Sequence, residues 1–147
     1  MQGIKVSLHP DFEFGSTDTR SFKDYPKLTP EEELSVVSFM NKVTNGDPLI
    51  GKNKPSWEYD SGDRIPNREY FEEHKFWHYH SGPSYPSHFT ISKMTIALAK
   101  NVDGIPSPEV IHYRKLPDEI VITGYSPEHV PFPNPYNPMN PIGYRHK

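Results

Sequence analysis

Two runs of β-branched and apolar residues in the last third of the chain predict a β-hairpin. The runs span residues 110–116 and 120–123, and both contain the Val, Ile, Tyr and Thr residues that favour strands. Pro117 and Asp118 lie between them. Proline presets φ for a turn, and aspartate accepts hydrogen bonds from the turn backbone. Two strand-like runs joined by a short polar turn are typical of a hairpin.

Two further segments have strand character. Apolar and polar residues alternate over residues 4–8, with Ile4, Val6 and Leu8 on one side, which is typical of an edge or first strand. Residues 75–80 (KFWHYH) provide the third member of a small sheet with the hairpin. Residues 89–99 (FTISKMTIALA) fit either a strand, because of their β-branched residues, or a helix.

One helix is strongly indicated after Thr29. Thr29 as N-cap, Pro30 at the first helical position and Glu32 three residues after the cap form a capping box. Asn45 and Gly46 provide a left-handed stop. The expected apolar stripe consists of Leu34, Val36, Val37, Met40 and Val43.

The remaining segments complete an α+β prediction. Residues 11–26 and 46–67 read as polar loops, and residues 68–74 as a short helix that leads into the third strand. We therefore expect a small, mostly antiparallel β-sheet with one or two N-terminal helices packed on one face. Residues 1–130 form this single domain, and residues 131–147 form a proline-rich tail of extended or polyproline II backbone.

Composition narrows the classes of function. The 147 residues include no cysteine, which excludes disulfides and thiolate metal sites. No apolar run approaches 18 residues and the N-terminus has no secretory h-region, so we expect no membrane partner and a cytoplasmic location. The net charge of −3 argues against a large nucleic-acid footprint, although a local basic patch fits it.

The histidines are the main candidates for chemistry. His78 and His80 are two residues apart on a strand and therefore point to one face. In the hairpin, His112 and Arg114 share one face and Tyr113 lies on the other. The strand register decides which of these faces joins His78 and His80, and the sequence does not supply it.

Three interpretations of this face stay open. Base and acid groups with a cation can cut RNA without a metal, and His78, His80, His129 and either Arg114 or Lys115 supply that set. An H-x-H pair with a third histidine could instead hold Zn²⁺ or Fe²⁺. The third interpretation is a non-catalytic binding protein, such as an antitoxin, an immunity protein or a phage-encoded inhibitor.

Four short motifs resemble a known family. They are LTPEEEL at 28–34, the H-x-H pair at 78–80, the VIHY strand that contains Tyr113, and SPEH at 126–129 after IVITGY. Their order, over roughly residues 28–132, resembles the RelE/ParE superfamily of toxins, and most of all the YafO-type toxins of type II toxin–antitoxin systems. The resemblance implies a RelE-like fold and a ribosome-dependent endoribonuclease (an mRNA interferase) that needs no cofactor and is inhibited by a cognate antitoxin.

The resemblance also implies roles for individual residues. His78, His80, Tyr113 and His129 become active-face candidates, and Arg114 a phosphate ligand. On the substrate side the candidates are Lys115, Tyr125 and Ser126, with Tyr113 or Tyr125 stacking on a base. The expected partners are mRNA on the ribosome and an antitoxin protein.

Overall fold

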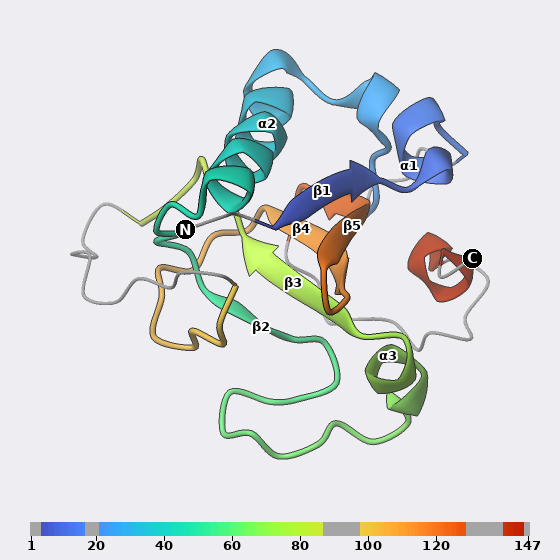
Figure 1. Cartoon of the computed structure of the whole chain (residues 1–147), viewed down its shortest axis with the longest axis vertical. Helices are drawn as coiled ribbons and strands as arrows, with labels where there is room; N and C mark the ends of the chain where they lie inside the picture. Colours follow the sequence, from blue (N-terminus) through green and yellow to red (C-terminus); the bar gives the residue numbers. More distant parts are fainter. Residues whose placement is uncertain (1–3, 17–20, 87–97, 129–139, 146–147) are drawn as a thin grey trace.

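The protein is organised around one mixed β-sheet (Figure 1). The computed structural model describes residues 4–16, 21–86, 98–128 and 140–145, and within them the strand order is β1-β5-β4-β3-β2. Neighbouring strands are antiparallel except β1 and β5, which are parallel. The α+β prediction is confirmed, with a parallel edge pairing that the sequence did not indicate. The strands are β1 (Lys5–Leu8), β2 (Asn53–Pro55), β3 (Phe76–His80), β4 (Val110–Lys115) and β5 (Glu119–Ser126).

The predicted hairpin forms the centre of the sheet. Strands β4 and β5 pair antiparallel from Val110 opposite Ser126 to Lys115 opposite Ile120, with a register shift between His112 and Tyr113. Strand β5 extends beyond the predicted end at residue 123 to Ser126. The first half of β5, from Glu119 to Ile122, also pairs with β1 on its other side, so β1 is the edge strand that its alternating pattern predicted.

Helix α2 (Pro30–Asn45) covers one face of the sheet. Its capping box forms as predicted, because Thr29 Oγ1 accepts from the backbone of Glu32 and the Glu32 carboxylate accepts from the backbone of Thr29. Gly46 ends the helix in the left-handed region, at φ 73°. The apolar stripe is rotated from the predicted one: Phe39 is buried, whereas Leu34 is 67% exposed.

The rotation of α2 follows from what its face contacts. Val36, Phe39 and Val43 are spaced i, i+3, i+7 and enter the core together. The Phe39 ring stacks on Tyr79, with 5.0 Å between ring centroids, and lies 5.7 Å from the ring of Tyr113. Burial of the large Phe39 ring therefore decides which side of the helix faces the sheet. Leu34 lies about 200° around the helix from Val36 and so points to solvent.

Two predicted loops contain regular structure. Residues 11–26 include helix α1 (Pro10–Phe14), capped by the His9 side chain, and the 3₁₀ helix η1 (Tyr25–Lys27). Residues 46–67 include strand β2. The loop predictions were wrong at these points because a histidine cap is unusual, and because a three-residue strand that contains proline shows no alternation of its own.

The other face of the sheet carries a smaller apolar cluster of Phe22, Phe71, Phe76 and Ile142. Phe71 comes from helix α3 (Glu69–Glu73), which begins directly after Arg68, and Ile142 from the 3₁₀ helix η2 (Pro141–Tyr144). Part of the predicted tail therefore packs on the domain. The interpretations of residues 89–97 and of the tail at 131–139 lie outside the described residues.

The buried side chain of Asn53 joins three separate segments. Its amide nitrogen donates to the carbonyls of Leu98 and Ala99, at 3.2 and 3.1 Å, and its carbonyl oxygen accepts from the Tyr113 hydroxyl at 2.6 Å. Its backbone exchanges two hydrogen bonds with Asn101. These contacts tie β2 to β4 and to residues 98–101, in addition to its pairing with β3.

A buried ion pair joins η2 to the N-terminal half. Arg145 is fully buried, and its guanidinium contacts both carboxylate oxygens of Asp24 at 2.8 and 3.0 Å. The same group donates to the carbonyl of Thr123 in β5 and to Ser16 Oγ. Bidentate pairing of this kind fixes both position and orientation.

We expect Asp24→Ala to lower the free energy of unfolding by about 3–5 kcal/mol, because it leaves a buried guanidinium without its counter-charge. Urea unfolding followed by circular dichroism measures the change. Arg64→Gln is the control: Arg64 pairs with Glu72 but is 67% exposed, so its loss leaves the urea midpoint in place. Equal effects of both substitutions would contradict the importance of the buried pair.

Candidate functional site

The strand register brings three histidines onto one face of the sheet. His78 in β3 lies directly opposite His112 in β4, and paired residues of neighbouring strands point to the same side. His80 follows two residues after His78 and shares that side. The faces that the sequence left open are thereby assigned: His112 joins His78 and His80, and Tyr113 faces away.

His78 and His80 line a cleft of about 540 Å³, which we call the histidine cleft. Lys54 belongs to β2 and lies opposite His78, and Lys52 precedes β2. The backbone nitrogen of His80 donates to the carbonyl of Lys52 at 2.8 Å. The lining is completed by a carboxylate and by a proline-rich wall: Asp60, Pro86, Pro106, Ser107 and Pro108.

The protein frame orients both imidazole rings. Their centroids are 5.7 Å apart and the rings are inclined at 58°. His78 Nδ1 lies 3.0 Å from the hydroxyl oxygen of Ser56, and His80 Nδ1 lies 2.7 Å from the carbonyl oxygen of Ser107. The backbone nitrogen of Ser107 also lies 3.2 Å from the same Nδ1. The carbonyl can only accept and the backbone N–H can only donate, so Ser107 holds the His80 ring through Nδ1 in either tautomer.

The two lysines share one carboxylate. Lys52 Nζ lies 2.5 Å from Asp60 Oδ2, and Lys54 Nζ lies 2.8 Å from Asp60 Oδ1. Partial burial raises the pKa of Asp60, but the hydrogen bonds and charges of the two lysines outweigh it and lower that pKa to about 2. The cleft therefore holds two cations, one anion and two imidazoles near neutral pH.

His112 and Ser126 lie on the histidine face but outside the cleft. His112 Nε2 lies 2.8 Å from Ser126 Oγ, and its ring packs at 5.6 Å from the ring of Phe22. Both His112 and Ser126 are buried, as His78 and His80 are, but neither lines the cleft. The prediction of Ser126 as a substrate-binding residue is therefore corrected: the structure pairs it with His112, beside Phe22 of the second apolar cluster.

Tyr113 and Tyr125 are core residues. Both are fully buried on the α2 side of the sheet, with Tyr113 bonded to Asn53. Burial raises the pKa of each phenol well above its usual range. The structure thus separates both tyrosines from His78 and His80, and the expectation that either stacks on a base is corrected. Side chains alternate between the two sides of β4, so Tyr113 lies on the side of the sheet away from His112.

Arg114 and Lys115 are also held away from the cleft. Arg114 lies opposite Phe76, at the end of β3 away from His80. Its Nε donates to the carbonyl of His74 at 2.9 Å. Lys115 Nζ donates to the carbonyl of Leu98 at 2.7 Å and lies 4.4 Å from the centre of the Trp77 ring. Burial lowers the pKa of both groups. His129 lies outside the described residues.

Sequence reasoning missed the cationic half of the cleft. Lys52, Lys54 and Asp60 lie in the segment 46–67 that the sequence predicts to be a polar loop, and none of them is among the predicted site residues. The available signal was the spacing of the two lysines around Asn53, which places them on one side of an extended segment. Gly51 was a second hint: a side chain there would meet the carbonyl oxygen of His80 at 1.9 Å, so only glycine allows this approach.

Comparisons with known proteins add no further assignment. No family model, no curated protein and no solved structure matches the chain. Among residues 4–16, 21–86, 98–128 and 140–145, no group of three histidine or carboxylate side chains is placed to hold a metal ion. Within the same ranges, every helix is too short or too polar to cross a membrane.

The burial of Tyr113 and Tyr125 predicts alkaline instability. Both stay protonated in the folded state, whereas the unfolded chain loses these protons as the pH rises above about 10, so the free energy of unfolding falls there. Tyr113→Phe removes one such group and should reduce the fall by up to about 1.4 kcal/mol per pH unit. Urea titrations between pH 8 and 11 measure it; an unchanged slope in both Tyr113→Phe and Tyr125→Phe would contradict the core assignment.

Proposed function

We propose that the protein is a metal-independent endoribonuclease whose active site is the histidine cleft. The observation that carries the proposal is the convergence of His78 and His80 with Lys52 and Lys54 in one cleft. Imidazoles can move protons near neutral pH, and ammonium groups stabilise the charge that develops on a phosphate under attack. This combination supports cleavage of the RNA backbone by its own 2′-hydroxyl.

The proposed reaction is a transphosphorylation. His80 accepts the proton of the 2′-hydroxyl, and the 2′-oxygen attacks phosphorus. Lys54 and Lys52 stabilise the extra negative charge on the phosphorane oxygens. The bond to the 5′-oxygen breaks, and His78 supplies the proton that this oxygen takes. The products are a 2′,3′-cyclic phosphate and a free 5′-hydroxyl, and every proton is accounted for.

The hydrogen bonds of the two rings support this division of roles. Ser107 holds His80 through Nδ1, by its carbonyl oxygen at 2.7 Å and its backbone nitrogen at 3.2 Å, so the proposal uses Nε2 of His80 to accept the proton of the 2′-hydroxyl. The Ser56 hydroxyl at His78 can either donate or accept, so His78 can be held in the charged form that an acid needs. A two-histidine mechanism predicts a bell-shaped dependence of rate on pH.

The biological setting of this proposal comes from the family resemblance. YafO-type toxins imply mRNA on the ribosome as substrate, a cognate antitoxin as partner and the cytoplasm as the place of action. The ribosome would position the RNA, which allows a site with few cationic groups to reach a useful rate. Arg114 donates to the carbonyl of His74, so Lys52 and Lys54 take its expected role as phosphate ligands.

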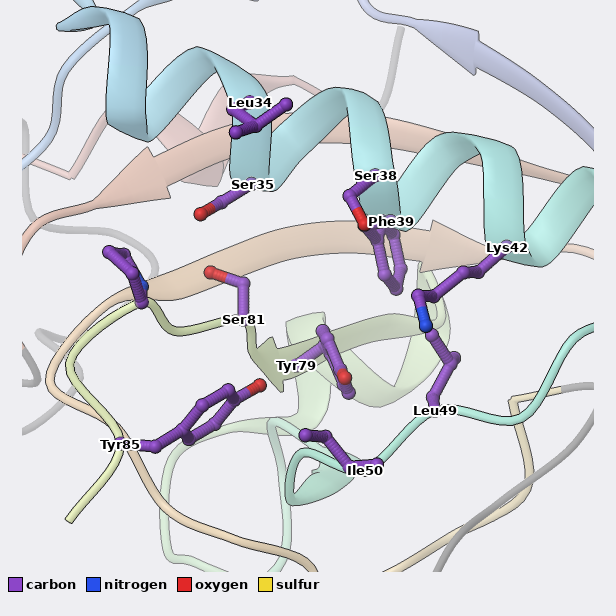
Figure 2. Close-up of a pocket in the computed structure, with 11 residues that line it drawn as sticks. Leu34, Ser35, Ser38, Phe39, Lys42, Leu49, Ile50, Tyr79, Ser81 and Tyr85 are labelled. Atoms are coloured by element: carbon purple, nitrogen blue, oxygen red, sulfur yellow. The ribbon is translucent and has the colours of Figure 1, made fainter. Parts of the chain in front are cut away.

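Non-catalytic binding is the second candidate, favoured by a separate groove of about 270 Å³ between α2 and β3. Figure 2 shows Ser35 and Ser38 of α2 directed toward Tyr79 and Ser81, with Tyr85 at one end. Leu34 lies on the rim of this groove and is largely exposed. A binding protein of this kind would leave bacterial growth unchanged when expressed, whereas the nuclease would arrest growth and leave cuts in mRNA.

We expect His80→Asn to slow cleavage of a fluorogenic RNA oligonucleotide by about 10²–10⁴-fold and Lys54→Met by about 10²–10³-fold. Asparagine keeps an amide group for the contact with the Ser107 carbonyl. His74→Gln is the matched control, since His74 packs on Tyr70 outside the cleft, and it should cleave as the wild type does. Equal rates in all four proteins would refute the active-site assignment.

A further inference from the structure

We infer that Asp60 is a built-in competitor of the substrate phosphate: its carboxylate occupies the position between Lys52 and Lys54 where an RNA phosphate binds. The inference rests on the proposed function, because it assigns those lysines as a phosphate subsite. It goes further because it assigns Asp60 a function: the carboxylate lowers the apparent affinity of the cleft for RNA.

The contacts of Asp60 are those expected of a phosphate stand-in. Each carboxylate oxygen pairs with a different ammonium group: Oδ2 lies 2.5 Å from Lys52 Nζ, and Oδ1 lies 2.8 Å from Lys54 Nζ. A phosphate group offers two oxygens at a similar spacing and carries at least the same charge. The lysine side chains are only 19% and 10% exposed, whereas that of Asp60 is 56% exposed. The anion therefore lies on the solvent side of the two cations.

The loop that carries Asp60 is anchored at its base rather than at its tip. Ile65 donates a backbone hydrogen bond to Trp57 at 2.9 Å, and the Glu58 carboxylate pairs with Lys100 at 2.8 Å. The tip is a tight turn closed by the backbone bond from Gly62 to Tyr59, at 2.9 Å. Asp60 can therefore leave the lysines by a local change at the tip, while the base keeps its place.

Competition, rather than protonation, must remove Asp60. Its pKa of about 2 keeps the carboxylate charged at every physiological pH. Ion pairs with a solvent-exposed partner contribute little net free energy, so a phosphate that also contacts His78 or His80 can replace it. A buried carboxylate in the same position would block the subsite permanently. The exposure of Asp60 therefore makes the competition reversible.

The test measures binding without cleavage. Fluorescence anisotropy follows a fluorescein-labelled 2′-O-methyl RNA hexamer, which lacks the nucleophile and stays intact. We expect Asp60→Asn to bind it about tenfold more tightly than the wild type, a change of about 1.4 kcal/mol. Asparagine preserves the size of the side chain. Adding Lys54→Met to Asp60→Asn should abolish the gain, because the vacated subsite then lacks its more buried cation.

Asp63→Asn is the matched control, since Asp63 lies on the same loop, is exposed and accepts from Ser61. It changes the net charge by the same amount and should leave the affinity within twofold of the wild type. Equal gains in Asp60→Asn and Asp63→Asn would reduce the effect to overall charge and overturn the inference, as would no gain in Asp60→Asn. Tighter binding by Asp60→Asn with no cleavage of unmodified RNA would uphold the phosphate subsite and refute the endoribonuclease.

Discussion

The buried amide of Asn53 is the constraint on which the candidate site depends. A strand of three residues at the end of a sheet has few hydrogen bonds of its own, and β2 is such a strand. Asn53 compensates by bonding through its side chain to Tyr113 on one side and to Leu98 and Ala99 on the other. Its two neighbours in sequence are Lys52 and Lys54. The same extended backbone that turns Asn53 inward turns both lysines toward His78 and His80.

This arrangement divides the sheet into two faces with different tasks. The α2 face is an apolar core in which even polar groups such as Tyr113 and Asn53 satisfy each other. The histidine face is apolar near Phe71 and Phe76 and polar near His80. His112 marks the boundary: it lies opposite His78, yet it is committed to Ser126 and Phe22. The charged and imidazole groups that line the histidine cleft therefore lie at the end of this face formed by β2 and β3.

The sequence predicts those parts of the fold in which local signals agree. The capping box of α2, the turn at Pro117 and the alternation before Leu8 each act within a few residues, and all three elements form where expected. Strand β2 could not be found this way, because its place depends on Asn53 contacts more than 40 residues away. The site shows the same limit. His78 and His80 share a side because they lie two residues apart on one strand. Lys52, Lys54 and Asp60 reach them only through the path of the long connection at residues 46–67.

The pair between Arg145 and Asp24 joins residues 121 positions apart. During synthesis at about 5–20 residues per second, Asp24 is added to the chain roughly 6–24 s before its partner. Until then the carboxylate keeps its water, and the Phe22 side of β5 lacks the η2 segment that covers it. The first apolar layer, built by α2 on the hairpin, can form earlier in this interval than the second. The α2 layer needs the chain up to Ser126, whereas the η2 layer and its buried ion pair also need Arg145.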